Sequence, residues 1–487
     1  MNGVLPHRDS SARKNLRLTG YLLVIVILSA LLALTLIRTR PAPPVTAFTV
    51  QYWQWGAERQ LTQSENADLT AMPVDGICWW CGSITLESGS PRFHARGGQL
   101  KGISEIPKWA VVRIDPSCNP LLGKDLAGLR QEILKGLKRG DVTGPVSGLQ
   151  IDWDVPSRRL REYADFLTGL RQDLPATTGL SCTGLVTWLD TAHVDAVAHA
   201  VDWWVPQCYS TDVPDDISNA TALVCRVDPG AVVERCARLE RPFRIGIPTF
   251  EQSSLWSKEG KLMSAALPIA CEDALAADFN AVVVAGDVAS DREHLIRFTA
   301  RRDLVLAGRM IPDGATLLIG EPTVSSVSKQ IAGIRARGGP WCRGISFFRL
   351  SGSGELPCLS TSQVRTAWMQ QAAIASASTP SESAVRWMWE GGSNGWKLVI
   401  MNEGLADWTN LVKPLRLDIG STLVPGSSPA HIRVLPALSG VPTGPAHATG
   451  SLVMIPFLRS GAKVSLTFSA HDAEPPTALL MTDEDSP

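Results

Sequence analysis

The chain has 487 residues and a formal net charge of -1, with 45% hydrophobic and 19% charged residues. This composition is ordinary for a globular protein, and the length suffices for two domains or for one large barrel with an accessory domain. Because the sequence has no basic excess, we expect no nucleic acid as a partner.

The first predicted element is a membrane-spanning helix at residues 18–37. The run LTGYLLVIVILSALLALTLI carries no charge and is long enough to cross a bilayer. Basic residues are more numerous before it than after it, which favours a cytoplasmic segment 1–17 and an exported remainder. No small-residue cleavage site follows, so we expect an uncleaved inner-membrane anchor with the linker 38–45; a cleaved signal peptide is the alternative. The main domain would then lie in the periplasm or outside the cell.

Residues 46–377 carry strand-like apolar runs that alternate with helix-like segments. The runs lie at 47–53, 76–86, 109–115, 148–155, 179–186, 202–210, 244–250 and 344–350. In the segment 157–174 the apolar residues recur at helical spacing, which predicts an amphipathic helix. Eight strands with helices between them predict an α/β fold, a (β/α)8 TIM-type barrel.

The connection between the seventh and eighth runs, residues 251–343, is too long for a single helix. It contains the strand-like pieces NAVVVAGDV and ATLLIG and the helix-like piece SSVSKQIAGIRARG. We expect an insertion in one loop of the barrel. An alternative interpretation makes NAVVVAGDV a true barrel strand, which would shift the strand count by one.

The C-terminal part of the chain has a different character. A helix near 361–377 is followed by a Ser- and Pro-rich linker at 378–384. Residues 385–475 then show short β-like runs broken by Gly, Pro, Asn and Ser, which predict a β-sandwich-like accessory domain. Residues 476–487 form a tail.

The chain has ten cysteines, and an exported domain permits disulfides. Cys225 and Cys236, and likewise Cys342 and Cys358, are close enough in sequence to pair. Spacing alone does not determine the connectivity.

Cys78 and Cys81 form a CxxC motif in the stretch ICWWCG. A redox dithiol and half of a zinc site are two readings of this motif. A zinc site would need a second pair at similar spacing, and the sequence has none. A redox pair is expected at a helix N-terminus, whereas this motif lies in an apolar strand-like run. We therefore expect a structural role and no metal.

The fourth predicted strand, GLQIDWDV, carries polar residues on one face. Strand alternation places Gln150, Asp152 and Asp154 together, opposite an entirely apolar face. The apolar face fits beneath the surrounding helices, so the polar face must point into the barrel. Asp154 would then lie at the C-terminal mouth, where barrel enzymes carry their chemistry. A solvated edge strand is the alternative.

This strand resembles the DxxDxDxE motif on the fourth barrel strand of the chitinase-like glycoside hydrolases of family 18. Ser147 and Gln150 stand where the family has its first two aspartates. Asp152 matches the third aspartate, and Asp154 takes the place of the catalytic glutamate. The chain also resembles, in its QID-aromatic-D strand, an uncharacterised bacterial family of membrane-anchored glycosidase-like barrels.

Three later stretches are similar to family 18 in the same order. VPQCYS places Gln207 and Tyr209 where the sixth strand often has Gln-x-Tyr, and RIGIPTF is similar to the seventh strand. GISFFRL resembles the last strand, with Phe348 in place of the usual tryptophan at the barrel floor. The resemblance covers residues 46–355, including the long insertion that some members share.

The resemblance implies that Asp154 is the general acid, and that Asp152 and Tyr209 support the substrate's own N-acetyl group as nucleophile. Glycoside hydrolysis in general needs two carboxyls in different protonation states. Asp152 and Asp154 lie about 6.6 Å apart along a strand, close enough to push their pKa values apart. Such hydrolysis needs no cofactor.

Further residues are candidates for contacts with the substrate. They are Gln150, Gln207 and Phe348 inside the barrel, Asp212 and Glu251 after the sixth and seventh strands, and the tryptophans Trp53, Trp80, Trp188, Trp204 and Trp256 as stacking platforms. Asp115, after the third strand, is another candidate acid. For the loop acids a solvated side chain is the alternative, and for the tryptophans it is core packing.

We therefore predict a membrane-anchored, exported glycoside hydrolase that acts on a polysaccharide or oligosaccharide of the envelope or the extracellular space. The first alternative is a glycan-binding barrel without catalysis, because Asp154 is one methylene shorter than the expected glutamate and catalytic geometry tolerates little displacement. The second alternative is a thiol-redox module built on Cys78 and Cys81.

Overall fold

The computed structural model describes part of the chain. The described residues are 47–55, 59–96, 100–101, 106–139, 146–209, 217, 227–265, 267–277, 279–285, 294–350, 357–369, 385–392, 395–404, 408–409, 415–421, 423–424, 427–436, 451–459, 461–468 and 475–480. The expected anchor at 18–37, the linker 378–384, Asp212 and Cys225 lie outside these residues. Within them, no helix combines the length and the apolar character that a membrane crossing requires.

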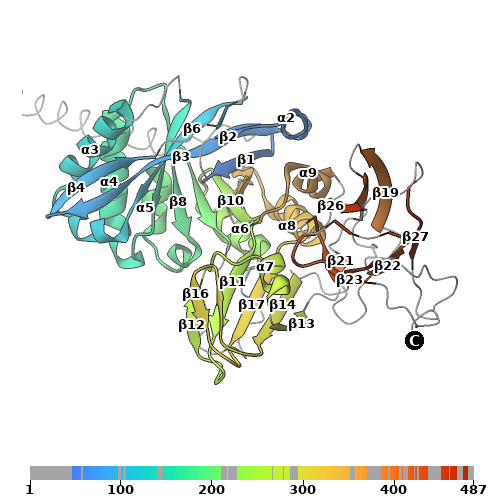
Figure 1. The fold of residues 1–487 in the computed structure, drawn as a ribbon. Coiled ribbons are helices and arrows are strands. Elements are labelled where there is room, and N and C mark those ends of the chain that lie inside the picture. Colours follow the sequence, from blue (N-terminus) through green and yellow to red (C-terminus); the bar gives the residue numbers. More distant parts are fainter. Residues whose placement is uncertain are drawn as a thin grey trace, which may run out of the picture. The chain divides into compact units, whose positions relative to one another are not determined.

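Eight parallel strands close into a barrel (Figure 1). They are β1 (Thr49–Gln54), β3 (Val74–Glu87), β6 (Lys108–Ile114), β7 (Gly148–Trp153), β8 (Gly179–Leu185), β9 (Trp203–Gln207), β10 (Phe243–Pro248) and β18 (Cys342–Phe348). The sheet runs β1-β18-β10-β9-β8-β7-β6-β3, and β3 pairs again with β1. These strands correspond to the eight predicted runs, so the TIM-type barrel is confirmed.

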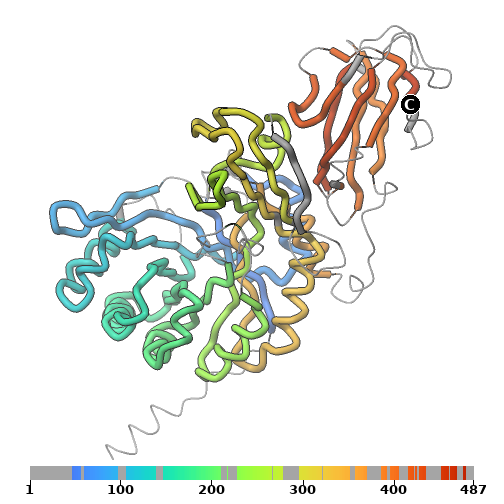
Figure 2. The backbone as a smooth tube through the Cα atoms, turned by 90° about the horizontal axis from the view of Figure 1, so that it is seen from below, coloured from blue at the N-terminus to red at the C-terminus, as the bar shows by residue number. Residues whose placement is uncertain are grey.

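Helices cover the outside of the barrel, and α3 to α6 follow one another around it in Figure 2. The helices are α2 (Gln63–Thr70), α3 (Leu126–Arg139), α4 (Leu160–Asp173), α5 (Val194–His199), α6 (Pro229–Ala237), α8 (Val324–Arg337) and α9 (Thr361–Met369). Short 3-10 turns are η1 (Pro116–Leu121), η2 (Ser157–Arg159) and η3 (Val186–Asp190), and two short strands, β2 (Arg59–Gln60) and β5 (Leu100–Lys101), pair with each other. After β3 the chain makes no helix but returns as β4 (Ser90–Ala95), antiparallel to β3.

Two tryptophans lie against each other inside the barrel, near the N-terminal ends of its strands. Trp109 of β6 and Trp203 of β9 meet edge to face, with ring centroids 4.3 Å apart. A Cβ atom on Gly148 or Gly179 would overlap the Trp109 ring. This close approach explains why β7 and β8 both begin with glycine.

The long connection after β10 forms a five-stranded antiparallel sheet of its own, in the order β12-β11-β17-β14-β13. Its elements are β11 (Gln252–Trp256), β12 (Leu262–Ala265), α7 (Cys271–Ala276), β13 (Phe279–Ala285), β14 (His294–Ala300), the hairpin β15 (Leu304–Leu306) and β16 (Arg309–Ile311), and β17 (Thr316–Glu321). NAVVVAGDV therefore contributes β13 to this sheet, and its alternative assignment to the barrel is wrong. The segment SSVSKQIAGIRARG forms most of α8 and ends at its C-cap, Gly338, before the chain returns to β18.

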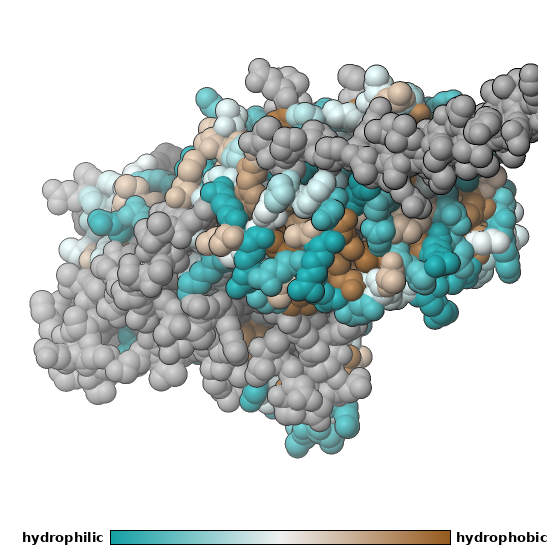
Figure 3. All heavy atoms as spheres, turned by 180° about the vertical axis from the view of Figure 1, so that it is seen from behind, coloured by the Kyte–Doolittle hydropathy of each residue, from teal (hydrophilic) through white to brown (hydrophobic). Residues whose placement is uncertain are grey.

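The C-terminal residues form small antiparallel sheets around one apolar core. One sheet holds β19 (Val385–Gly392), β20 (Gly395–Asn402) and β26 (Lys463–Phe468), another holds β22 (Leu415–Ile419), β23 (Arg433–Pro436), β24 (Ser451–Ile455) and β27 (Ala478–Leu480), and β21 (Trp408–Thr409) pairs with β25 (Phe457–Leu458). Ile400, Leu417 and Val453 from the two larger sheets belong to the shared core. On the face of the molecule drawn in Figure 3, hydrophilic side chains lie among the hydrophobic ones.

The expected disulfide between Cys342 and Cys358 is not formed. Cys342 begins β18, whereas Cys358 pairs with Phe250 beyond the opposite ends of β18 and β10. A seven-residue strand spans about 20 Å, whereas a disulfide needs Cα atoms within about 7 Å. The described cysteines form no disulfide with one another, and Cys236 has its predicted partner outside the described part.

Candidate active site

The polar face of β7 points into the barrel, as the strand alternation predicts. Gln150 is completely buried, accepts a hydrogen bond from the Trp53 indole N–H, and donates one to Ser181 Oγ at 3.1 Å. On the opposite face, Trp153 packs edge-on against Tyr163 and Phe166 of α4. The helix contact and the interior hydrogen bonds together fix which way the acids of this strand point.

Asp152 is held in place by side chains from three other barrel strands. Its Oδ1 accepts hydrogen bonds from Thr183 Oγ1 at 2.7 Å and from Gln207 Nε2 at 3.4 Å. Arg113 Nη1 lies 3.9 Å from its Oδ2. Burial raises the pKa of Asp152, while the bond from Thr183, the charge of Arg113 and the bond from Gln207 lower it. This carboxyl group is therefore firmly oriented.

Asp154 follows β7 at the mouth of the barrel and is partly buried. Burial raises its pKa, the neighbouring Asp152 raises it further, and Arg113 lowers it. No described side chain forms a hydrogen bond or an ion pair with it, in contrast to Asp152. Asp154 thus differs from Asp152 in having no such partner among the described residues, and its burial favours the protonated form.

Aromatic residues form one wall beside the two aspartates. Tyr209 stacks on Phe348 with ring centroids 5.5 Å apart and also meets Phe250 edge to face. Trp55 contacts Phe348 edge-on at 5.6 Å. Burial raises the pKa of Tyr209, and Asp152 and Asp154 raise it further. Tyr209 therefore keeps a neutral hydroxyl that can donate a hydrogen bond.

Two of the predicted tryptophan platforms lie next to this wall. Trp53 is 2% exposed and packs beneath Phe348. Trp80 stacks on Trp55 with centroids 4.3 Å apart, and the Arg96 guanidinium lies 3.9 Å from its ring. Both rings thus pack against protein groups, and their role as platforms for a sugar stays a prediction.

Three further predicted platforms are core residues. Trp188, Trp204 and Trp256 are completely buried. Trp188 donates to the Val155 carbonyl behind β7, and Trp256 donates to Ser254 within the sheet of the insertion. The core alternative is correct for all three.

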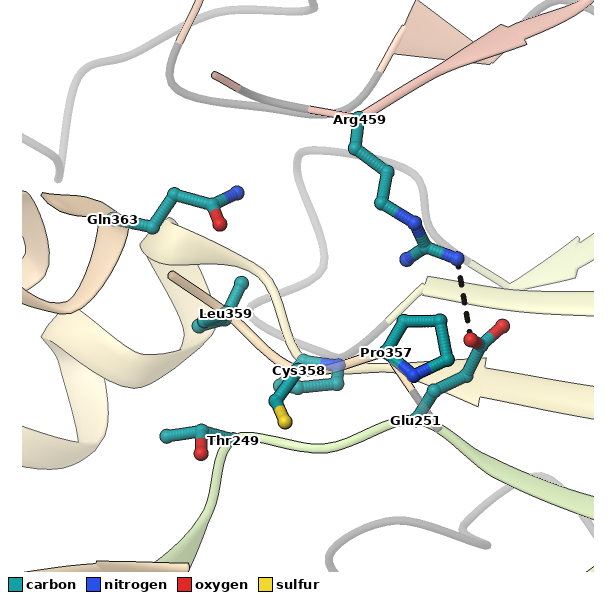
Figure 4. Close-up of a pocket in the computed structure, with 8 residues that line it drawn as sticks. Thr249, Glu251, Pro357, Cys358, Leu359, Gln363 and Arg459 are labelled. Atoms are coloured by element: carbon teal, nitrogen blue, oxygen red, sulfur yellow. Dashed lines mark hydrogen bonds and ion pairs between the residues drawn. The ribbon is translucent and has the colours of Figure 1, made fainter. Parts of the chain in front are cut away.

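Glu251 does not join the aspartates. It is 1% exposed, its Oε1 accepts the backbone N–H of Cys271 at 2.8 Å, and its Oε2 lies 3.2 Å from Arg459 Nη2. Figure 4 shows the Arg459 guanidinium reaching toward it across a pocket also lined by Thr249 and Leu359. Both carboxylate oxygens thus bind protein groups, and a contact of Glu251 with a substrate stays a prediction.

The two remaining predicted loop acids are Asp115 and Asp212. Asp115 accepts the backbone N–H of Ser117 at 2.8 Å and caps η1. The bonds from Ser117 lower its pKa, so Asp115 is a capping residue. Asp212 lies outside the described residues.

The CxxC motif does not form a dithiol pair. Cys78 points into the barrel beside Trp53 and Trp109, whereas Cys81 belongs to the apolar layer outside the strands. Burial raises the pKa of Cys81 to about 12, and it raises that of Cys78 as well. Low reactivity is expected of such thiols, and this geometry contradicts the redox hypothesis. Among the described residues, no cluster of His, Cys, Asp and Glu could hold a metal ion.

Three residues of the site were not among those predicted: Arg113, Thr183 and Trp55. Each lies on the inward face of its strand or directly after it. Arg113 is in register with Asp152 on the neighbouring strand. The alternation that identified Asp152 also places Arg113 and Thr183 inside the barrel, so strand parity alone could have found them.

Among known protein families, a model described as "Domain of unknown function (DUF3142)" matches residues 104–302, which include both aspartates. No curated protein matches the chain. Similar solved structures include a chitinase from Chromobacterium violaceum, the spore cortex-lytic enzyme SleL from Bacillus megaterium and a chitinase from Rhizomucor miehei, with identities of 16%, 13% and 11%.

The TM-scores of these three structures are 0.43, 0.43 and 0.40. Each alignment covers 66% of this chain, and 100%, 73% and 100% of the respective other chains. Structural similarity of this degree does not indicate an activity. The function is therefore inferred from the residues of the site.

Proposed function

We propose that the protein is a glycoside hydrolase in which Asp154 is the general acid and Asp152 its electrostatic partner. One observation carries the proposal: two carboxyl groups lie at the mouth of the barrel in unequal surroundings. Asp152 is fixed by Thr183 and Gln207, whereas Asp154 has no such partner in the described part of the chain and lies closer to solvent. Unequal surroundings let one carboxyl donate a proton while the other stays ionised.

In the proposed reaction, Asp154 donates its proton to the glycosidic oxygen as the bond from that oxygen to the anomeric carbon breaks. The positive charge that develops on the sugar faces the Asp152 carboxylate. A water molecule then supplies hydroxide to the anomeric carbon, and its remaining proton returns to Asp154. The resemblance to family 18 adds a role for the substrate's N-acetyl group, which Tyr209 and Asp152 would orient.

We further propose that the enzyme is exported and held in the inner membrane by residues 18–37, and that it acts on an envelope or extracellular polysaccharide. The uncharged run and the excess of basic residues before it support this placement.

The test is the Asp154→Asn variant. It should lose turnover of a polysaccharide that the wild type cleaves, measured as release of new reducing ends. Asp165→Asn is the matched control, because Asp165 is exposed on α4 and outside the site. Circular dichroism should show both variants folded, and unchanged turnover by the Asp154→Asn variant would refute the assignment.

A glycan-binding barrel without catalysis is the second candidate, and one observation favours it: the acid at position 154 is an aspartate. If the shorter side chain fails to reach the glycosidic oxygen, the wild type should bind a glycan without cleaving it. The Asp154→Glu variant separates the two candidates. Activity gained only in that variant would favour the second candidate.

A further inference from the structure

Two arginines and two tryptophans form a stack beside the aspartates, which we name the arginine–tryptophan ladder. The Arg113 guanidinium lies 5.7 Å from the centre of the Trp55 ring. Trp55 stacks on Trp80 with an interplanar angle of 19°, and Arg96 follows at 3.9 Å. The ladder thus runs from the inward face of β6 to the end of β4.

Within the described part of the chain, Arg113 has one ion pair, a long one with Asp152, and Arg96 has none. The acid nearest to Arg113 is Asp152, and their 3.9 Å separation exceeds hydrogen-bonding distance. The Arg113 side chain is 41% exposed. Arg96 is exposed, and no carboxylate among the described residues lies within ion-pair distance of it. Both cations therefore keep N–H donors for a ligand.

The groups that the ladder presents determine which chemical group of a sugar it could bind. Trp55 stacks on the Trp80 ring, and the Arg96 guanidinium also lies over that ring. The ladder thus combines stacked indoles with guanidinium N–H groups. Guanidinium groups bind carboxylates in a bidentate manner, and the aromatic rings hold them in position before the ligand arrives.

The charge on the aspartates is compatible with an anionic ligand. Burial raises the pKa of both carboxyl groups, and Arg113 lowers it. Arg113 moreover lies within ion-pair range of Asp152 and offsets its charge.

We infer that the substrate is an acidic polysaccharide whose sugar carboxylates bind the guanidinium groups of Arg113 and Arg96. This inference rests on the proposed function, since it assigns a substrate class to the same site. A neutral glycan of the same length would offer no carboxylate to either guanidinium.

The experiment measures binding by calorimetry in the Asp154→Asn background, which keeps the ligand intact. The probes are an oligogalacturonate and a neutral oligomer of N-acetylglucosamine of equal length. The oligogalacturonate should bind more tightly, and Arg96→Gln and Arg113→Gln should each weaken it by about tenfold, the size of one charge-assisted hydrogen bond. Binding of the acidic probe should also weaken as salt is added.

Two further variants serve as controls for the binding measurement. Arg92→Gln removes an exposed arginine of β4 that is not part of the ladder, and it should leave binding unchanged. Arg113→Lys keeps the charge and should bind more tightly than Arg113→Gln. Arg96 contacts Trp80 and has no ion pair with either aspartate, so its variant reports on the ladder even where Arg113→Gln disturbs Asp152.

The outcomes separate this inference from the proposed function. Equal or tighter binding of the neutral probe, or no effect of Arg96→Gln, overturns the acidic substrate while the hydrolase assignment stands on its own assay. Arginine-dependent binding of the acidic probe with no cleavage of it or any other glycan by the wild type supports the inference and overturns the hydrolase.

Discussion

At the scale of single residues, the environment of each acid decides its role. Asp152 and Asp154 are two positions apart, yet Thr183 and Gln207 bind only the first. Sequence alternation predicted that both acids face inward. It could not predict the contacts that distinguish them, because those come from strands far away in the sequence.

Arg113 gives a testable pH dependence at this scale. Its charge lowers the pKa of both aspartates. A general acid acts in its protonated form, so activity is lost as the pH rises through its pKa. Arg113→Gln should therefore move the basic limb of the kcat/KM profile to higher pH. A limb that moves to lower pH, or stays in place, would contradict the role given to Arg113.

At the scale of elements, the alternation of apolar and polar residues predicted all eight barrel strands. This prediction succeeded because each strand buries one face under helices and the other inside the barrel. It did not predict that β4 replaces the helix after β3, since strand pairing there depends on contacts rather than periodicity. Parity also explains the failed CxxC hypothesis, because residues three apart on a strand face opposite ways.

The contact between β7 and α4 should dominate the stability of this part of the barrel. Trp153 is 1% exposed, packs against Tyr163 and Phe166, and donates to Asn119 at 2.9 Å. Trp153→Ala should lower the free energy of unfolding by about 3–5 kcal/mol, measured by urea denaturation. Asp165→Ala, on the exposed face of α4, should change it by less than about 0.5 kcal/mol. Equal effects of both variants would contradict the packing described.

At the scale of the whole molecule, residues distant in sequence connect the parts of the described chain. Phe457 of the C-terminal strands packs into the core of the insertion. Arg459 binds Glu272 of α7 at 2.6 Å and Glu251 after β10 at 3.2 Å. The sequence suggested nothing of this, because ion pairs between distant segments leave no local pattern.

This ion-pair cluster should hold the C-terminal strands to the insertion. Arg459→Ala removes charge-assisted bonds to two carboxylates, at a cost of about 2–3 kcal/mol. Limited proteolysis should then release a C-terminal fragment faster than in the wild type. Arg416→Ala, on β22 of the same C-terminal part, is the comparison variant, and equal rates for the two variants would argue against the cluster.

The most direct test of the central claim compares two substrates in the Asp154→Asn variant. A general acid matters most when the leaving group is a poor one, as in a polysaccharide, and little for an activated aryl glycoside of the same sugar. We predict a loss of about 10²–10⁴-fold in kcat on the polysaccharide, with the aryl glycoside largely unaffected. Equal losses on both substrates, or none on either, would contradict the assignment of Asp154 as the proton donor.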